Sequence, residues 1–103
     1  MNIEENTLVF KLTEDSTSFD LKNLNNIDTG VKFFIADVRG VSIELLKNIK
    51  NKFVTFDQTI SDINGSFVIV SKFFFDDALK IVPTLQEAYD YIEMEEMERQ
   101  LEL

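Results

Sequence analysis

Ser42 is the residue whose type and position most readily suggest chemistry. It follows the apolar segment Val31–Val38 and Gly40, and apolar residues at helical spacing come after it. A hydroxyl at the start of a helix can accept a hydrogen bond from a backbone amide as an N-cap. It can also carry a phosphate, which a helix N-terminus tolerates electrostatically. Glu44 opposes a phosphate there, so the sequence favours the cap and leaves phosphorylation of Ser42 open.

Pairs of acidic residues are the other candidates for chemistry. Asp76–Asp77 and Glu95–Glu96 supply oxygen ligands, but neither pair has the spacing of a Ca²⁺-binding loop. Adjacent residues on a helix point about 100° apart, so such carboxylates do not converge on one ion. The chain has no His and no Cys, which excludes His bases, Cys nucleophiles and thiolate zinc sites. We therefore expect no metal, no cofactor and no enzyme activity.

Four apolar segments predict the strands that position these residues. The length of 103 residues favours a single domain over 1–103. Because apolar segments alternate with helical patterns, we expect a small α/β sandwich with a mixed, mostly parallel sheet of about four strands. The expected strands are Thr7–Leu12, Val31–Val38, Ser66–Ser71 and Leu79–Val82. The expected helices are a short one over 19–26, closed by a turn at Gly30, one from Ser42 with apolar positions as far as Phe56, and one over 84–101. Asn64-Gly65 is expected to form a tight turn.

The C-terminal acidic helix, 84–101, has two apolar stripes. Thr84 and Glu87 match the capping box that begins many helices. Leu85–Ile92 place one stripe against the sheet, and a second stripe lies about 150° away on a helical wheel. We expect this second stripe to contact a second subunit, a protein partner or the N-terminal strand, with a solvated tail as the alternative. Its residues are Met94, Met97 and Leu101.

The charge of the chain is acidic and unevenly distributed. The net charge is −9, and residues 87–103 contribute seven acids and one Arg, a net charge of −6. Nucleic acid is a poor partner for such a surface, because phosphate binding needs a basic patch. The N-terminus lacks a basic signal-peptide region, and no apolar run is long enough to span a bilayer. We expect a cytoplasmic protein without a membrane partner.

Three segments resemble the STAS domain, the fold of anti-sigma factor antagonists. They are "VKFFIADVRGV", "DINGSFVIVS" and "DDALKIVPTLQEAYDYIEMEEMERQL". The likeness covers Val31 to Leu101, and the tail from Ile92 is similar to that of a bacterial subgroup that we associate with the Bacteroidetes. In this family the fold would have a third helix, which this chain shortens to a turn. The aromatic run Phe73–Phe75 is then expected to cover the sheet edge, and an exposed ring there would mark an interaction surface.

The resemblance implies a regulatory role in transcription by partner switching. Such proteins bind an anti-sigma factor-like kinase until a Ser or Thr in a D-S-[ST]-G loop is phosphorylated, which repels the partner. Asp37 matches the strand-end Asp, but the D-S-[ST]-G motif is absent, and Ser42 falls at the phosphoacceptor position only with a deletion of about four residues. The implied partner-binding residues are Arg39, Gly40, Val41, Ser42, Glu44 and Leu46.

Two functions follow as expectations. The first is a non-enzymatic protein-interaction module that resembles anti-sigma factor antagonists and has lost the phosphoacceptor motif. The alternative is a structural or assembly protein that forms a dimer through its C-terminal helix.

Overall fold

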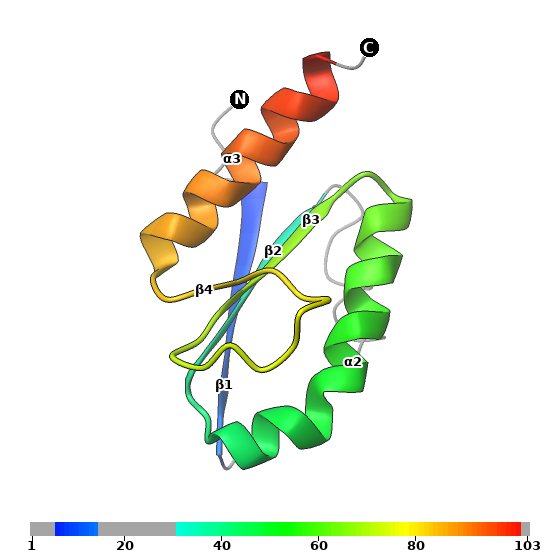
Figure 1. Ribbon diagram of the computed structural model, residues 1–103. Helices are drawn as coiled ribbons and strands as arrows, with labels where there is room; N and C mark the ends of the chain where they lie inside the picture. The colour runs from blue at the N-terminus through cyan, green and yellow to red at the C-terminus, as the bar shows by residue number, and fades with distance from the viewer. Residues whose placement is uncertain (1–5, 15–30, 102–103) are drawn as a thin grey trace.

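Within the described residues, a four-stranded sheet carries one helix on each face (Figure 1). The computed structural model describes residues 6–14 and 31–101. The elements in chain order are β1 (Thr7–Thr13), β2 (Phe33–Gly40), α2 (Ile43–Asp62), β3 (Ser66–Val70), β4 (Ile81–Val82) and α3 (Leu85–Leu101). The prediction of a small α/β fold with about four strands is confirmed. The helix predicted over 19–26 and the turn at Gly30 lie outside the described residues.

The sheet is parallel throughout the described strands. The strands lie in the order β1-β2-β3-β4, and each neighbouring pair is parallel. In this register Ile35 of β2 lies between Val9 of β1 and Val68 of β3. The prediction of a mixed sheet is corrected in this respect. Continuous apolar runs indicate that a strand is covered on both faces, but they say less about its direction.

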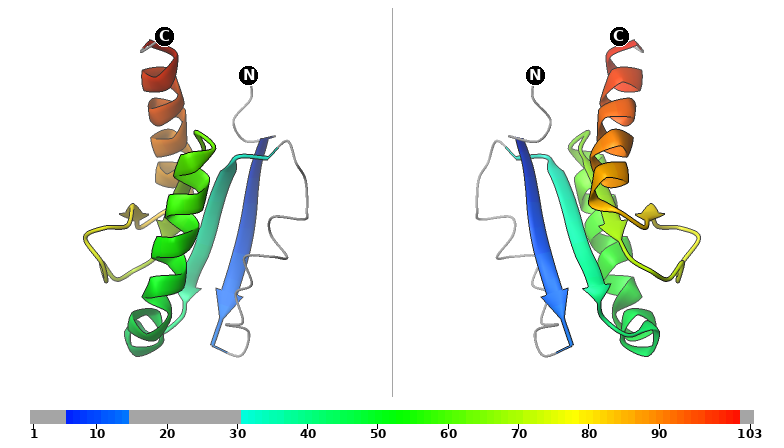
Figure 2. Two further views of the ribbon diagram at one scale, coloured as in Figure 1. Left: turned by 90° about the vertical axis from the view of Figure 1, so that its right-hand side faces the viewer. Right: turned by 90° about the vertical axis from the view of Figure 1, so that its left-hand side faces the viewer.

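Each face of the sheet has its own apolar core, because side chains of a strand alternate between faces. Figure 2 shows α2 on one side of the sheet and α3 on the other. Phe34 and Ala36 of β2 join the core under α2, whereas Phe33 and Ile35 join the core under α3. All four side chains are buried, which explains why this strand is apolar at consecutive positions.

Helix α2 begins at the predicted cap, Ser42. It continues past Phe56, the last apolar position that was expected for it. Its buried residues are Leu46, Ile49, Phe53, Phe56 and Ile60. The helix ends at Asp62, and Asn64 then adopts the left-handed conformation with φ of 59°. A Cβ at Gly65 would collide with the Lys32 carbonyl oxygen and with the Ile60 side chain. The predicted Asn64-Gly65 turn is therefore confirmed, and its glycine is needed for close packing rather than for φ.

Between β3 and β4 the chain forms turns and no helix. Phe75 is buried, and its ring lies 6.2 Å from that of Phe53, so it covers this edge of the core as expected. Phe73 and Phe74 are exposed, Phe74 to 65%. The last strand is shorter than predicted, because Leu79 is buried in the core ahead of Ile81–Val82 instead of pairing as a strand residue.

Helix α3 begins as the capping pattern predicts. The Thr84 hydroxyl accepts a hydrogen bond of 3.1 Å from the Glu87 amide. Ala88 and Ile92 are fully buried against the sheet, in the same core as Phe33. Among the helices that the structure describes, none has both the length and the apolar character needed to cross a membrane.

Candidate functional site

The loop that follows β2 is the first candidate site. In open parallel sheets, ligands and partners commonly bind beyond the carboxyl ends of the strands, where this loop lies. At the end of β2, just before this loop, Asp37 and Arg39 form a two-pronged ion pair: Arg39 Nε donates to Asp37 Oδ1 at 3.0 Å, and Arg39 Nη2 donates to Oδ2 at 2.8 Å. The Arg39 amide also donates to Oδ1 at 3.2 Å. The end of β2 therefore presents an arginine whose guanidinium is held by Asp37.

The Asp37 carboxylate is held in its charged form. Hydrogen bonds from the Arg39 side chain lower the pKa of Asp37 below its ordinary value, although burial acts in the opposite direction. The same carboxylate raises the pKa of Arg39. A carboxylate with a lowered pKa is a poor proton acceptor near neutral pH. Asp37 thus holds the Arg39 side chain in place at the end of β2.

Ser42 has the geometry of a helix cap. Its Oγ accepts a hydrogen bond of 3.4 Å from the Leu45 amide, and its backbone is extended, as an N-cap requires. The Ser42 amide donates to the carboxylate of Glu14, which follows β1. Glu44 is exposed in the first turn of the helix. The cap interpretation is confirmed, while phosphorylation of Ser42 stays a prediction.

The expected partner-binding residues divide into a surface set and a core set. Arg39, Gly40 and Glu44 are exposed, and Ser42 is half-buried. Val41 and Leu46, in contrast, are buried in the core under α2. These two apolar side chains support the loop from beneath, so the expected partner surface, which stays a prediction, consists of the other four residues.

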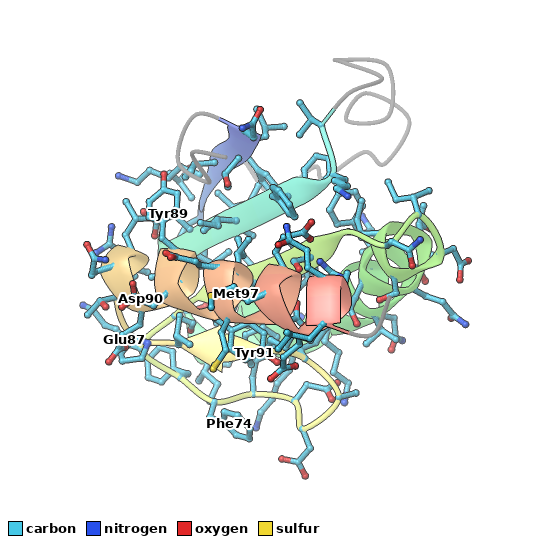
Figure 3. All side chains as sticks on the ribbon, turned by 90° about the horizontal axis from the view of Figure 1, so that it is seen from above. Phe74, Glu87, Tyr89, Asp90, Tyr91 and Met97 are labelled. Carbon is cyan, nitrogen blue, oxygen red and sulfur yellow. The ribbon has the colours of Figure 1, made fainter. Side chains whose placement is uncertain are left out.

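The outer side of α3 is the second candidate site. Met94, Met97 and Leu101 are exposed to 54%, 58% and 84% respectively. Figure 3 shows Met97 on α3 and Phe74 on the loop between β3 and β4. The helix continues through Leu101, and its inner side is bonded to the sheet as far as Arg99. These apolar side chains therefore lie on an anchored helix.

A polar network fastens the second half of α3 to the sheet. The Ser66 hydroxyl donates to Glu95 Oε1 at 2.7 Å and accepts from Arg99 Nη2 at 2.8 Å. Arg99 also donates to the Gly65 carbonyl oxygen and pairs with Glu96 at 2.8 Å. Sequence reasoning missed this network. The one sequence feature that pointed to it was Arg99, the single basic residue of 87–103, a segment that also contains seven acids.

Lys80 joins this network to α2. Its ammonium group lies 3.2 Å from Glu95 and 4.0 Å from Asp57, and 5.9 Å from the centre of the Tyr91 ring. Burial raises the pKa of Asp57 above its ordinary value. The Lys80 charge offsets part of this increase, and the Glu95 charge adds to it. The arrangement is a chain of ion pairs between helices on opposite sides of the sheet, beside its short edge strand β4.

Glu95 and Glu96 were considered as oxygen ligands for a metal ion. In the structure both carboxylates form ion pairs with basic side chains of the protein. Glu95 contacts Lys80 and Arg99, and Glu96 contacts Lys32 and Arg99. Over 6–14 and 31–101, no group of three or more acidic side chains is placed to hold a metal ion.

Comparison of the chain with protein-family models, with curated proteins and with solved structures gives no match.

Proposed function

We propose that this chain is a protein-interaction module that resembles anti-sigma factor antagonists and binds a regulatory partner without chemistry of its own. Its partner surface is the loop Arg39–Glu44. The observation that carries the proposal is the Asp37–Arg39 ion pair at the end of β2, which holds an exposed arginine beside the loop at the carboxyl edge of a parallel sheet. Arg39 keeps 45% of its side chain exposed within that pair, so it is available to a partner. A side chain that is already held in place lowers the ordering cost of binding.

Phosphate at Ser42 is disfavoured by the surroundings of its hydroxyl. A phosphoserine adds about −1.5 to −2 charges at neutral pH. The Glu14 carboxylate already occupies the Ser42 amide, and Glu44 lies in the first turn. We propose that binding at this loop proceeds without a phosphate switch, in keeping with the absence of the D-S-[ST]-G motif.

Substitution at Gly40 offers a direct test. A Cβ at Gly40 meets no atom within 4 Å, and the residue has no positive φ, so the fold accepts a side chain there. Titration calorimetry with a kinase-like anti-sigma factor from the same organism measures affinity. Gly40→Gln should weaken binding at least about tenfold by obstructing the loop. Ser61→Gln, at an exposed position near the end of α2, is the matched control.

Three results decide this proposal. Unchanged affinity in Gly40→Gln would show that the loop is not the partner surface. Ser42→Ala should lower the melting temperature but leave affinity intact, because only the cap is lost. Incorporation of phosphate at Ser42 by the kinase, seen by intact mass together with loss of binding, would restore the phosphate switch and contradict the second part of the proposal.

A structural or assembly role remains the second candidate. It is favoured by the exposed Met94, Met97 and Leu101 on α3. Truncation after Glu93 removes all three side chains. If this role is correct, sedimentation velocity should find a dimer for the full chain and a monomer for the truncated chain.

A further inference from the structure

The outer face of α3 combines an apolar stripe with acidic borders. At about 100° per residue, Met94, Met97 and Leu101 fall within an arc of about 60°. On the same projection Glu93 lies about 40° beyond one side of the arc, and Glu98 about 40° beyond the other. Glu87 and Asp90 continue the acidic surface toward the start of the helix, where Figure 3 labels them. All of these side chains are exposed.

The basic side chains near α3 form ion pairs on the side of the helix that faces the sheet. Lys32, Lys80 and Arg99 pair with Glu95, Glu96 and Asp57. Among the described residues, no cation forms an ion pair with Glu87, Glu93 or Glu98. The outer face is therefore apolar and uniformly negative, on a helix already held in place by the network at Ser66.

We propose that the outer face of α3 binds a basic amphipathic segment of another protein. Apolar side chains of that segment would cover Met94 and Met97, while its Lys or Arg residues would face Glu93 and Glu98. Met side chains adapt to the shape of an apolar partner. This surface is separate from the Arg39–Glu44 loop and does not depend on the proposed function.

Electrostatics select this occupant over the others. A second copy that packed its α3 against this one would oppose Glu93 and Glu98 with the same acids, and like charges held together are repulsive. Nucleic acid and anionic lipid surfaces meet the same repulsion. A basic segment instead gains from every acid along the border.

The size of the face sets the strength of binding. From Glu87 to Leu101 the helix is roughly 22 Å long and, with side chains, about 10 Å wide. A contact over a face of this size buries well under the roughly 1,200 Å² of surface at which stable protein interfaces begin. The complex therefore belongs to the weak, transient class. Added salt should weaken it further, since exposed charges contribute much of the attraction.

The probe for the test is an 18-residue peptide of Leu and Lys with one apolar helical face. Its control is a shuffled peptide of the same composition without that face. Amide chemical-shift mapping on the full chain should place the amphipathic peptide on the outer face of α3. The shuffled peptide should bind about tenfold more weakly, because it cannot cover the Met stripe while meeting the acids.

Charge-matched variants separate this site from general attraction to an acidic protein. Glu93→Gln with Glu98→Gln changes the net charge from −9 to −7, and so does Asp62→Lys at the C-terminal end of α2, the helix on the opposite face of the sheet (Figure 1). The double variant should weaken binding about tenfold, and Asp62→Lys should weaken it less than about threefold. Equal losses in both, or shifts spread over the whole surface, would overturn the proposal. A dimer of the unbound chain that Met97→Ser dissociates would also overturn it, with a second copy as the occupant.

Discussion

Arg99 on α3 and Ser66 at the start of β3 are joined by a hydrogen bond of 2.8 Å between Nη2 and Oγ, although 33 positions separate them in the chain. The Ser66 hydroxyl is buried and donates its own hydrogen bond to Glu95. This contact holds the helix that covers one face of the sheet, so its loss should be felt in the stability of the whole domain.

Arg99→Met should destabilise the protein by about 1–2 kcal/mol, because it removes hydrogen bonds to Ser66, Gly65 and Glu96. For a domain of this size, that corresponds to a fall in Tm of about 5–15 °C. Thermal unfolding followed by circular dichroism measures it. Gln100→Ala, at the exposed neighbouring position, is the control and should change Tm little. An unchanged Tm in Arg99→Met would mean that the network contributes nothing net.

Asp37→Asn should make the free energy of unfolding less dependent on pH in the acid range. The pKa of Asp37 is lowered in the folded protein, chiefly by its hydrogen bonds to Arg39. Its charged form therefore stabilises the fold above the ordinary carboxyl pKa, and this contribution is lost as pH falls through the lowered pKa. Urea unfolding from about pH 2 to about pH 7 should show that wild type exceeds Asp37→Asn most at neutral pH. A gap independent of pH would contradict this pKa shift.

Asp57→Asn should show the opposite dependence. Burial raises the pKa of Asp57 in the folded protein, so the folded state binds its proton more tightly than the unfolded chain does. The associated stability is present below the ordinary carboxyl pKa and is lost as pH rises through the raised one. Stability of Asp57→Asn relative to wild type should thus increase from acid toward neutral pH in the same urea series. A relative stability that decreased over this range would be inconsistent with the shift.

Substitution in the aromatic run should separate its core ring from its surface ring. Phe75→Ala should cost about 3 kcal/mol, because the ring is buried against Phe53 at the edge of the core. Phe74→Ala should change stability by less than about 0.5 kcal/mol, since the ring is exposed. Urea unfolding of the two variants, which lose the same side chain at adjacent positions, makes the comparison direct. Similar costs at both positions would be contrary to this assignment.

Local signals in the sequence predicted most of the fold. Ser42 and Thr84 were expected as caps, and each hydroxyl accepts a backbone amide three residues on. Asn64-Gly65 was expected as a turn and ends α2. These features depend on neighbouring residues alone, so a single sequence contains the information. The direction of the strands and the burial of the Val41 side chain depend on how distant segments pack. Both differed from expectation.

The candidate sites were predictable only in part, for the same reason. The exposure of Met94, Met97 and Leu101 follows from helical spacing relative to the buried stripe. The Asp37–Arg39 ion pair needed the local backbone geometry at the end of β2, which residue types do not specify. The bond between Ser66 and Arg99 needed the position of α3 over the whole sheet. No spacing rule connects those two residues.

The division of the core between two helices has a consequence for how the chain is made. Phe33, Ile35, Val68 and Val70 form a face that is covered by α3, the last described element to be synthesised. While the earlier part of the chain has left the ribosome and these 17 residues have not, that face has no cover. Exposed apolar strands of this kind are prone to aggregation. The nascent chain should therefore need protection by a chaperone until α3 emerges.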